Sequence, residues 1–258
     1  MLFAVDIGNS NVVIGLWDGE QWVQTWRVHT LQRDDAQVYY EQQLQNLLLE
    51  NDIRPTPRDR AVISSVVPAL TPVFKTLFDQ FIAQSVVVVH PDLYPGLEIK
   101  INRPNEIGTD LLANAVAARH LYRADCVVVD FGTALTFTTC TANGEILGVA
   151  ITPGLQTAIR ALFQKTAQLP EVPLQLPESV VGKNTTHAIQ SGVLEGYIGL
   201  VRHMIARIRA EVGMHYQVIG TGGLSAILHP LQADFDYVNP YLTLDGLRII
   251  DAYLLERT

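Results

Sequence analysis

Near the start of the chain, an acidic side chain and a glycine end an apolar run, in the sequence VDIGNSN. Gly8 has no Cβ, so a bulky anion can approach the backbone of this turn closely. The amides of the turn, with the side chains of Asn9, Ser10 and Asn11, are donors suited to phosphate oxygens. Because Asp6 would repel a phosphate, its carboxylate indicates a cation between the two groups.

The same pattern occurs again in the middle of the chain, in the sequence VDFGTALTF. Asp130 and Gly132 match Asp6 and Gly8, and Thr133 supplies a hydroxyl donor. In both copies an apolar run and a turn of the type Asp-Gly-Glu or Asn-Gly-Glu follow in register. One copy alone could be a tight hairpin with a capping aspartate, but two copies indicate an internal duplication with a phosphate-binding turn in each half.

Hydrophobic patterning predicts the elements that carry these turns. In the first half we expect strands at 2–6, 11–16, 22–28, 60–67 and 85–90, an extended piece at 96–101, and helices at 35–51, 70–83 and 108–122. In the second half we expect three strands within 126–151, a strand ending in 218–223, and helices at about 155–165, 186–211 and 243–255. This alternation, without a low-complexity linker, predicts an α/β fold.

The composition excludes several classes of partner. Of the 258 residues 48% are hydrophobic, which suits a folded domain with a sizeable core. The net charge is −8 and no run of Lys or Arg forms a basic stripe, so we expect no nucleic acid and no anionic membrane surface as a partner. No leader and no stretch of about 18 apolar residues occurs, which favours a cytoplasmic protein.

Two other nucleotide motifs do not fit. PESVVGKNT has Pro177 at the first glycine position of a P-loop and Asn184 in place of Ser or Thr. GTGGLS places Ser225 where a dinucleotide-binding fingerprint requires its last glycine. The run VIGTGGLSAIL at 218–228 is instead a third glycine-rich turn, between a strand and a helix, against which a flat ring or a ribose could lie.

A further carboxylate is predicted at the start of a helix, in the sequence Gly108-Thr109-Asp110. The positive end of the helix dipole favours an ionised carboxylate there. Such a group can orient an attacking hydroxyl and accept its proton in phosphoryl transfer. Thr109 or Asp110 could also be an N-terminal cap, and the two roles are compatible.

These residues resemble the acetate/sugar kinase and actin-like ATPase superfamily, and more narrowly the type III pantothenate kinases. The resemblance runs through blocks along nearly the whole chain: DIGNS, SSVVP, EIGTDLLANAVAA, VDFGTALTF, ITPGLQTA, TAQLP, VGKNTTHAIQSG and GTGG. It implies two ribonuclease-H-like halves, at 1–115 and 116–258, each with a mixed five-stranded-type sheet and flanking helices. It also implies ATP-dependent phosphorylation of pantothenate to 4'-phosphopantothenate, the first step of coenzyme A biosynthesis.

The resemblance further implies partners and site residues. We expect a homodimer whose interface completes the substrate site, Mg²⁺ bound with ATP, and a monovalent cation, K⁺ or NH₄⁺, at Asp130. Asp110 is expected to be the base. The expected ATP-binding residues are Asp6, Ile7, Gly8, Asn9, Ser10, Asn11, Val12, Val13 and Thr133. The expected substrate-binding residues are Gly108, Thr109, Asp110, Leu111 and Thr185.

Two positions depart from the family on the acceptor side. Leu111 stands where the family usually has Arg, and Ile101 where it usually has Tyr. Leu cannot replace a guanidinium that pairs with a carboxylate, so an anionic acceptor needs another cation. The cations considered are Lys100, Arg103 and Arg160. The alternatives are a kinase for another small hydroxyl acceptor and a non-catalytic, nucleotide-binding regulatory relative.

Overall fold

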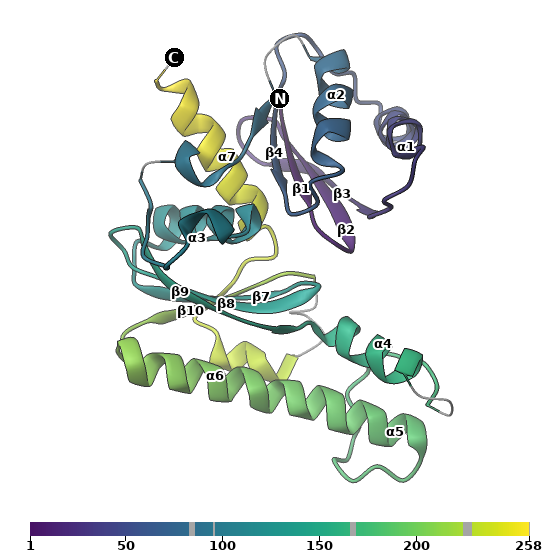
Figure 1. Ribbon diagram of the computed structural model, residues 1–258, viewed down its shortest axis with the longest axis vertical. Helices are drawn as coiled ribbons and strands as arrows, with labels where there is room; N and C mark the ends of the chain where they lie inside the picture. The colour runs from purple at the N-terminus through teal and green to yellow at the C-terminus, as the bar shows by residue number, and fades with distance from the viewer. Residues whose placement is uncertain (83–85, 95, 166–168, 224–228, 258) are drawn as a thin grey trace. The chain divides into compact units, whose positions relative to one another are not determined.

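The computed structural model describes residues 1–82, 86–94, 96–165, 169–223 and 229–257, and they form two compact units (Figure 1). Unit 1 consists of Met1–Gly96, Asn102–His120 and Thr243–Thr258, and unit 2 of Leu97–Ile101 and Leu121–Leu242. The predicted division between residues 115 and 116 falls inside helix α3, Thr109–Tyr122. The units therefore differ from two consecutive halves, and the C-terminal helix belongs to unit 1.

Unit 1 is built on a sheet of five strands in the order β3-β2-β1-β4-β5. The strands are β1 (Leu2–Ile7), β2 (Asn11–Trp17), β3 (Trp22–His29), β4 (Arg60–Ser65) and β5 (Val87–Val88). β1, β2 and β3 are antiparallel neighbours, whereas β4 and β5 run parallel to β1. This is the predicted ribonuclease-H-like arrangement, although the strand expected at 85–90 is shorter.

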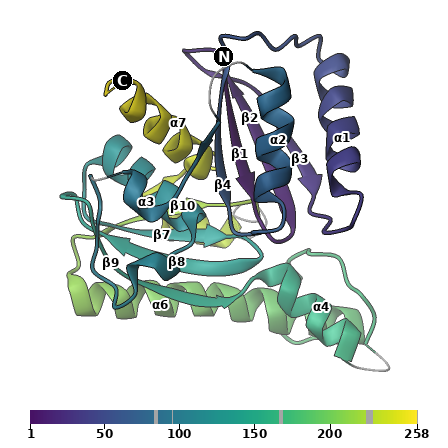
Figure 2. The same ribbon diagram turned by 45° about the horizontal axis from the view of Figure 1, so that its top comes forward.

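The helices of unit 1 match the predicted ones within a few residues. They are α1 (Ala36–Glu50), α2 (Thr71–Phe81), α3 (Thr109–Tyr122) and α7 (Leu242–Leu255), with short 3₁₀ turns at Pro91–Leu93 and Pro104–Glu106. α1 and α2 lie on the same face of the sheet (Figure 2). None of the described helices of the chain is long and apolar enough to cross a lipid bilayer.

Alternation along β1 explains which face α1 and α2 cover. Phe3, Val5 and Ile7 are at most 1% exposed and share one core with Tyr40 of α1 and Phe74 of α2. Side chains at every second position of a strand point to the same face. Burying each such side chain stabilises the fold by about 1.5–3 kcal/mol. Asp6, on the opposite face, stays outside this core.

α7 is held in unit 1 by contacts that the sequence pattern does not reveal. A Cβ on Gly246 would overlap the backbone of Ala113, so α7 and α3 cross in close backbone contact. The Asp251 carboxylate accepts a 2.8 Å hydrogen bond from Nη2 of Arg60 on β4. Burial raises the pKa of Asp251, and the Arg60 hydrogen bond opposes this shift.

Unit 2 repeats the same arrangement and adds one strand, in the order β11-β10-β7-β8-β9-β6. The strands are β6 (Glu98–Ile99), β7 (Cys126–Phe131), β8 (Ala134–Cys140), β9 (Glu145–Pro153), β10 (Gln217–Thr221) and β11 (Tyr237–Val238). β7, β8 and β9 are antiparallel, and β10 and β11 run parallel to β7. The matching order of five strands confirms the duplication, and parallel pairing of β6 with β9 makes this sheet six-stranded.

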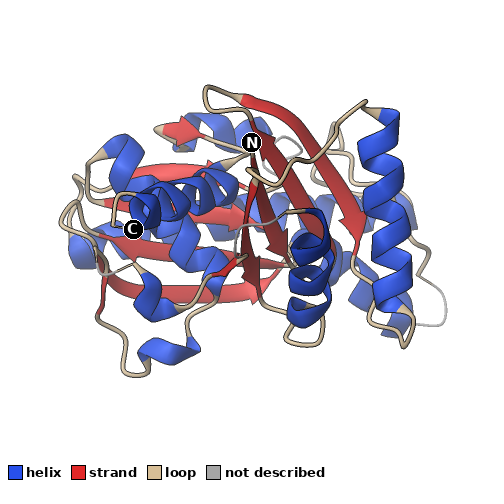
Figure 3. Ribbon diagram, turned by 90° about the horizontal axis from the view of Figure 1, so that it is seen from above, coloured by secondary structure: helices blue, strands red, loops and turns tan. Residues whose placement is uncertain are grey.

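The helices of unit 2 are α4 (Leu155–Lys165), α5 (Thr185–Gln190) and α6 (Gly196–Val212), with a π-helical turn at Ser191–Glu195 and a 3₁₀ segment at His229–Asp234. The helix predicted at 186–211 is therefore two helices joined by the π turn. α6 runs along one face of the sheet, where Ile198 and Val201 pack with Val127 and Val129 of β7 (Figure 1). Figure 3 distinguishes the helices of the fold from its strands by colour.

Candidate active site

The first turn, between β1 and β2 in unit 1, is closed by backbone and side-chain hydrogen bonds. The Gly8 amide donates to the Asn11 carbonyl oxygen at 3.0 Å. The Thr30 hydroxyl donates to the Gly8 carbonyl oxygen at 2.6 Å, and the Thr30 amide donates to the Ser10 carbonyl oxygen at 3.0 Å. A Cβ on Gly8 would lie 3.1 Å from the Asn11 carbonyl oxygen, so a larger residue would crowd the turn.

The residues predicted to bind ATP at this turn differ in what they can offer. The Ile7 and Val12 side chains are fully buried in the core, so these two residues can contact a ligand only through the backbone. Asn9 is exposed. The remaining side chains of this stretch are half-buried: Asp6, Ser10, Asn11 and Val13.

Asp6 is connected to the start of α3 by two hydroxyl groups. The Ser64 hydroxyl donates to Asp6 Oδ1 at 3.1 Å and lies 2.9 Å from the Thr109 hydroxyl. Thr109 Oγ1 also accepts from the Ser65 amide at 3.0 Å. Sequence reasoning gave Ser64 no role, although two serines at the end of a buried strand were a signal that polar groups gather there.

Asp110 lies in the first turn of α3, half-buried. The Leu111 amide donates to its Oδ1 at 2.8 Å. Burial raises the pKa of the Asp110 carboxyl, and the hydrogen bond from the Leu111 amide opposes this shift. A Cβ on Gly108 would overlap Asp110 Oδ1, so glycine at 108 permits this position of the carboxylate.

Leu111 was predicted to contact the substrate, but its side chain is only 7% exposed. The leucine side chain carries no polar group. At this position the chain can therefore offer a ligand only its backbone.

The second turn, between β7 and β8 in unit 2, is braced by the next strand and helix. The Gly132 amide donates to the Ala134 carbonyl oxygen at 3.0 Å. The Thr133 carbonyl oxygen accepts from the Gly154 amide at 2.9 Å and from the Thr157 hydroxyl at 2.8 Å. The Thr133 side chain is exposed.

Asp130, half-buried at the end of β7, packs beside the glycine-rich end of β10. Gly222 has φ +88°, and a Cβ there would lie 2.6 Å from Asp130 Oδ1 and 2.7 Å from the Phe131 amide nitrogen. Only glycine adopts this conformation without strain, so the predicted third glycine turn is needed for close packing against Asp130. The helix predicted to follow it lies outside the described residues.

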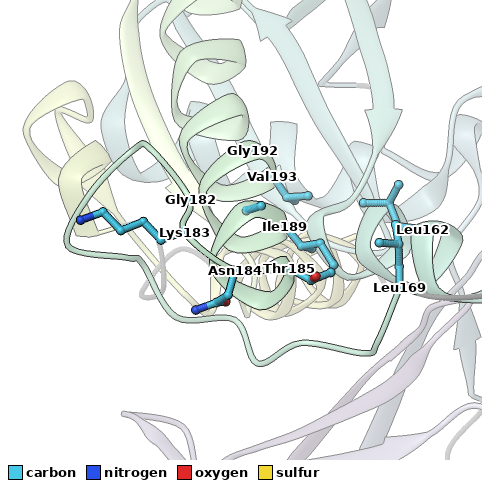
Figure 4. Close-up of a pocket in the computed structure, with 10 residues that line it drawn as sticks. Leu162, Leu169, Gly182, Lys183, Asn184, Thr185, Ile189, Gly192 and Val193 are labelled. Atoms are coloured by element: carbon cyan, nitrogen blue, oxygen red, sulfur yellow. The ribbon is translucent and has the colours of Figure 1, made fainter.

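Thr185 lines a cavity of about 610 Å³ in unit 2 (Figure 4). The cavity is lined by Leu162, Leu169, Gly182, Lys183, Asn184, Thr185, Ala188, Ile189, Gly192 and Val193. Asn184 caps α5 by accepting a 2.8 Å hydrogen bond from the His187 amide. The lining combines apolar side chains with a few polar ones, as small-molecule sites do.

Among the described residues, no cluster of three or more His, Cys, Asp or Glu side chains could hold a metal ion by itself. Mg²⁺ is usually bound by one or two carboxylates together with substrate phosphate oxygens. Asp6, a half-buried carboxylate at the end of β1 beside the first turn, is a ligand that fits such an ion.

Two of the three cations considered as partners for an anionic acceptor are already paired. Lys100 is paired with Glu98 and with Glu145, and Arg103 with Glu106 at 2.8 Å. Arg160 is exposed on α4 and forms no ion pair within the described part of the chain.

The duplicated sheet with an Asp-x-Gly turn in each unit defines the class: an actin-like ATPase and sugar kinase fold. A solved structure of MreB 5 of Spiroplasma citri bound to AMPPNP has this fold, with a TM-score of 0.54, 10% identity, and coverage of 99% of this chain and 97% of that one. At this identity the likeness concerns the fold alone.

The sequence comparisons are more specific. The sequence profile of the type III pantothenate kinases matches residues 2–207. A type III pantothenate kinase of Dehalococcoides mccartyi strain CBDB1 is 41% identical over 96% of this chain and 94% of its own length. One of Citrifermentans bemidjiense is 40% identical over 97% of this chain and 98% of its own length. The chain belongs to the type III pantothenate kinase family.

Proposed function

We propose that this protein transfers the γ-phosphoryl group of ATP to the hydroxyl of pantothenate and so forms 4'-phosphopantothenate in the first step of coenzyme A biosynthesis. Family membership over nearly the whole chain supports this function. The observation that carries it in the structure is Asp110, a half-buried carboxylate with a raised pKa at the start of α3, tied through Thr109 and Ser64 to Asp6.

Asp110 is the base. The pantothenate hydroxyl oxygen forms a bond to the γ-phosphorus as the bond to the β,γ-bridging oxygen breaks, ADP leaves, and the hydroxyl proton passes to the Asp110 carboxylate. A raised pKa makes this carboxylate a stronger base than an exposed aspartate. Gly108 supports the role because it leaves room for the carboxylate.

The two turns bind the ATP phosphates. Residues 6–13 contribute backbone amides and the polar side chains of Asn9, Ser10 and Asn11, and Thr133 contributes its exposed hydroxyl. Mg²⁺, held by Asp6, would neutralise charge on the phosphates, and Asp130 would hold the monovalent cation, K⁺ or NH₄⁺. The backbone of Gly222 packs closely beside the Asp130 carboxylate and fixes its position.

Pantothenate contacts Gly108, Asp110 and the backbone of Thr109 and Leu111, with Thr185 contributing its exposed hydroxyl. Its carboxylate needs a cation because Leu111 supplies none. Arg160 is the candidate, since Lys100 and Arg103 are paired with glutamates.

The working form is a homodimer in the cytoplasm that binds neither nucleic acid nor membrane. Unit 2 exposes large apolar side chains that a second copy could cover, among them Ile151 at 68%, Phe163 at 44% and Val181 at 74%. The net charge of −8 supports the absence of polyanionic partners. Light scattering after size exclusion should give twice the mass of one chain.

The experiment that tests the function is a panel of hydroxyl acceptors with radiolabelled ATP and Mg²⁺, run with and without K⁺. Pantothenate should be labelled, and K⁺ should raise the rate. Labelling of another small acceptor in its place would assign a different kinase activity. ATP binding without labelling of any acceptor would favour the non-catalytic regulatory relative.

A further inference from the structure

A chain of hydrogen bonds runs through unit 1 from the amide of Ser65 to Asp6. The amide donates to Thr109 Oγ1 at 3.0 Å, the hydroxyls of Thr109 and Ser64 are 2.9 Å apart, and the Ser64 hydroxyl donates to Asp6 Oδ1 at 3.1 Å. Ser64 is fully buried, so water does not compete for its hydroxyl. The chemistry proposed above assigns no part to Ser64 or to the hydroxyl of Thr109.

The direction of the chain follows from the protons available. A carboxylate has only acceptor atoms, so Ser64 gives its single proton to Asp6 and accepts from Thr109. Thr109 then donates to Ser64 and accepts from the Ser65 amide, and its 3.2 Å contact with the Ser65 carbonyl oxygen shares the same proton. Hydrogen bonds aligned in one direction polarise and strengthen one another.

The two hydroxyl residues of the chain belong to different parts of the proposed chemistry. Ser64 lies on β4 in register with Asp6 on β1, at the proposed phosphate-binding turn. Thr109 is the first residue of α3 and directly precedes Asp110, the proposed base. The Thr109 hydroxyl is fully engaged in this chain, which leaves no proton on it for a substrate.

We propose that Ser64 and Thr109 are positioning residues that hold Asp6 and the base Asp110 in a fixed relation. Thr109 acts through this chain and not through a hydrogen bond from its hydroxyl to the acceptor. The inference rests on the proposed phosphorylation of pantothenate, because it assigns how that reaction's carboxylates are held.

The test compares Ser64→Ala, Thr109→Val and the double variant in steady-state kinetics. Each single substitution should lower kcat about tenfold or more, because reacting groups shift when the chain is broken. Ser64→Ala removes the hydrogen bond to the Asp6 carboxylate, and Thr109→Val removes the bonds that hold the start of α3 to Ser64 and Ser65. The KM for pantothenate should stay within about twofold. Both residues act in one chain, so their effects should not add. The kcat of the double variant should lie within about twofold of the kcat of the slower single variant.

Two further variants separate positioning from a general loss of stability. Thr109→Ser keeps the hydroxyl and should return kcat to within about threefold of the wild type. Thr243→Val removes a comparable bond in the same unit, from Thr243 Oγ1 to Asn114 Oδ1 at 2.8 Å, and should leave kcat unchanged. Thermal melts of all variants show whether they fold. If Ser64→Ala does not fold, the near-isosteric variant Thr109→Val still tests the inference.

A readout without pantothenate separates this inference from the function on which it rests. Calorimetry should show Mg²⁺-dependent ATP binding weakened about fivefold by Ser64→Ala, because Asp6 loses its fixed position. If wild-type protein phosphorylates no pantothenate, the proposed function fails, and the binding data still decide on Ser64. Wild-type ATP binding and kcat in Ser64→Ala, or a Thr109→Val variant that raises only the KM for pantothenate, would overturn the positioning role.

Discussion

The turns at Asp6 and Asp130 stand at the same place in two copies of one sheet, but their neighbours differ. In register beside Asp6 is Ser64 of β4, and in register beside Asp130 is Thr221 of β10. The Asp6 carboxylate is connected to the start of α3 by hydrogen bonds through the hydroxyls of Ser64 and Thr109. β10, the strand beside Asp130, is followed by Gly222, whose backbone packs against the Asp130 carboxylate and the following peptide.

This difference teaches that duplication of the sheet does not duplicate its chemistry. Both turns keep a carboxylate followed two residues later by a glycine. Only the first is bonded to a helix that carries a second acid, Asp110. We therefore assign acceptor chemistry to unit 1. Substitutions beside Asp110 should lower kcat, whereas substitutions at the turn beside Asp130 should raise the KM for ATP.

The largest effect is expected for Asp110→Asn, which removes the base and keeps the shape. Because general base catalysis contributes about a hundredfold or more, kcat should fall by at least that factor while ATP binding persists. Single-turnover kinetics and calorimetry measure the two quantities. Wild-type turnover in this variant would remove Asp110 from the mechanism.

Gly108→Ala should come next, with kcat lowered about thirtyfold, because its Cβ displaces the Asp110 carboxylate and small misplacements near the reacting groups are costly. Gly148→Ala in unit 2 is the control, since a Cβ there meets nothing within 4 Å. Equal kinetics for the two variants would show that the Asp110 position is not critical.

Gly222→Ala tests the other turn. The side chain would be strained at φ +88° and would press on Asp130, at a cost of about 1–3 kcal/mol. The KM for ATP and the K⁺ requirement should rise about tenfold, with kcat at saturation changed less than threefold. A loss confined to kcat would contradict the division of roles between the turns.

The smallest effect is a displacement of the acid limb of the pH profile. Burial raises the pKa of Asp110 above 3.8, and the base acts deprotonated, so kcat should be lost as pH falls through that raised pKa. The ionised carboxylate favours catalysis but lowers the stability of the fold, because burial disfavours its charge above the pKa of the unfolded state. Asp110→Asn should therefore raise the melting temperature near pH 7 but not below pH 3.8. An acid limb at the pKa of an exposed aspartate would contradict burial as the cause.

Much of this could be predicted from the sequence because it is local. The apolar alternation around Asp6 and Asp130 fixes the hairpins, and the matching turns reveal the duplication. The placement of α7 could not be predicted, since it depends on Gly246 meeting Ala113 and on Asp251 meeting Arg60, residues far apart in the chain. Strand β6 was too short for its pairing with β9 to show in a periodic pattern.

The site was predictable to the same extent. Asp-x-Gly and Gly-Thr-Asp are contiguous and chemically specific, so Asp6, Asp130 and Asp110 stood out. Ser64 did not, because its role depends on β4 pairing in register with β1 and on α3 beginning beside it. The burial of the Leu111 side chain also could not be predicted, so any contact of this residue with a substrate stays a prediction that involves its backbone.

The central claim is tested most directly by following the phosphorus of γ-labelled ATP with purified protein, pantothenate, Mg²⁺ and K⁺. The account predicts one new phosphate ester, on the pantothenate hydroxyl, formed together with ADP and nearly abolished in Asp110→Asn. ADP formation without a pantothenate ester, or the same ester at the wild-type rate in Asp110→Asn, would contradict it.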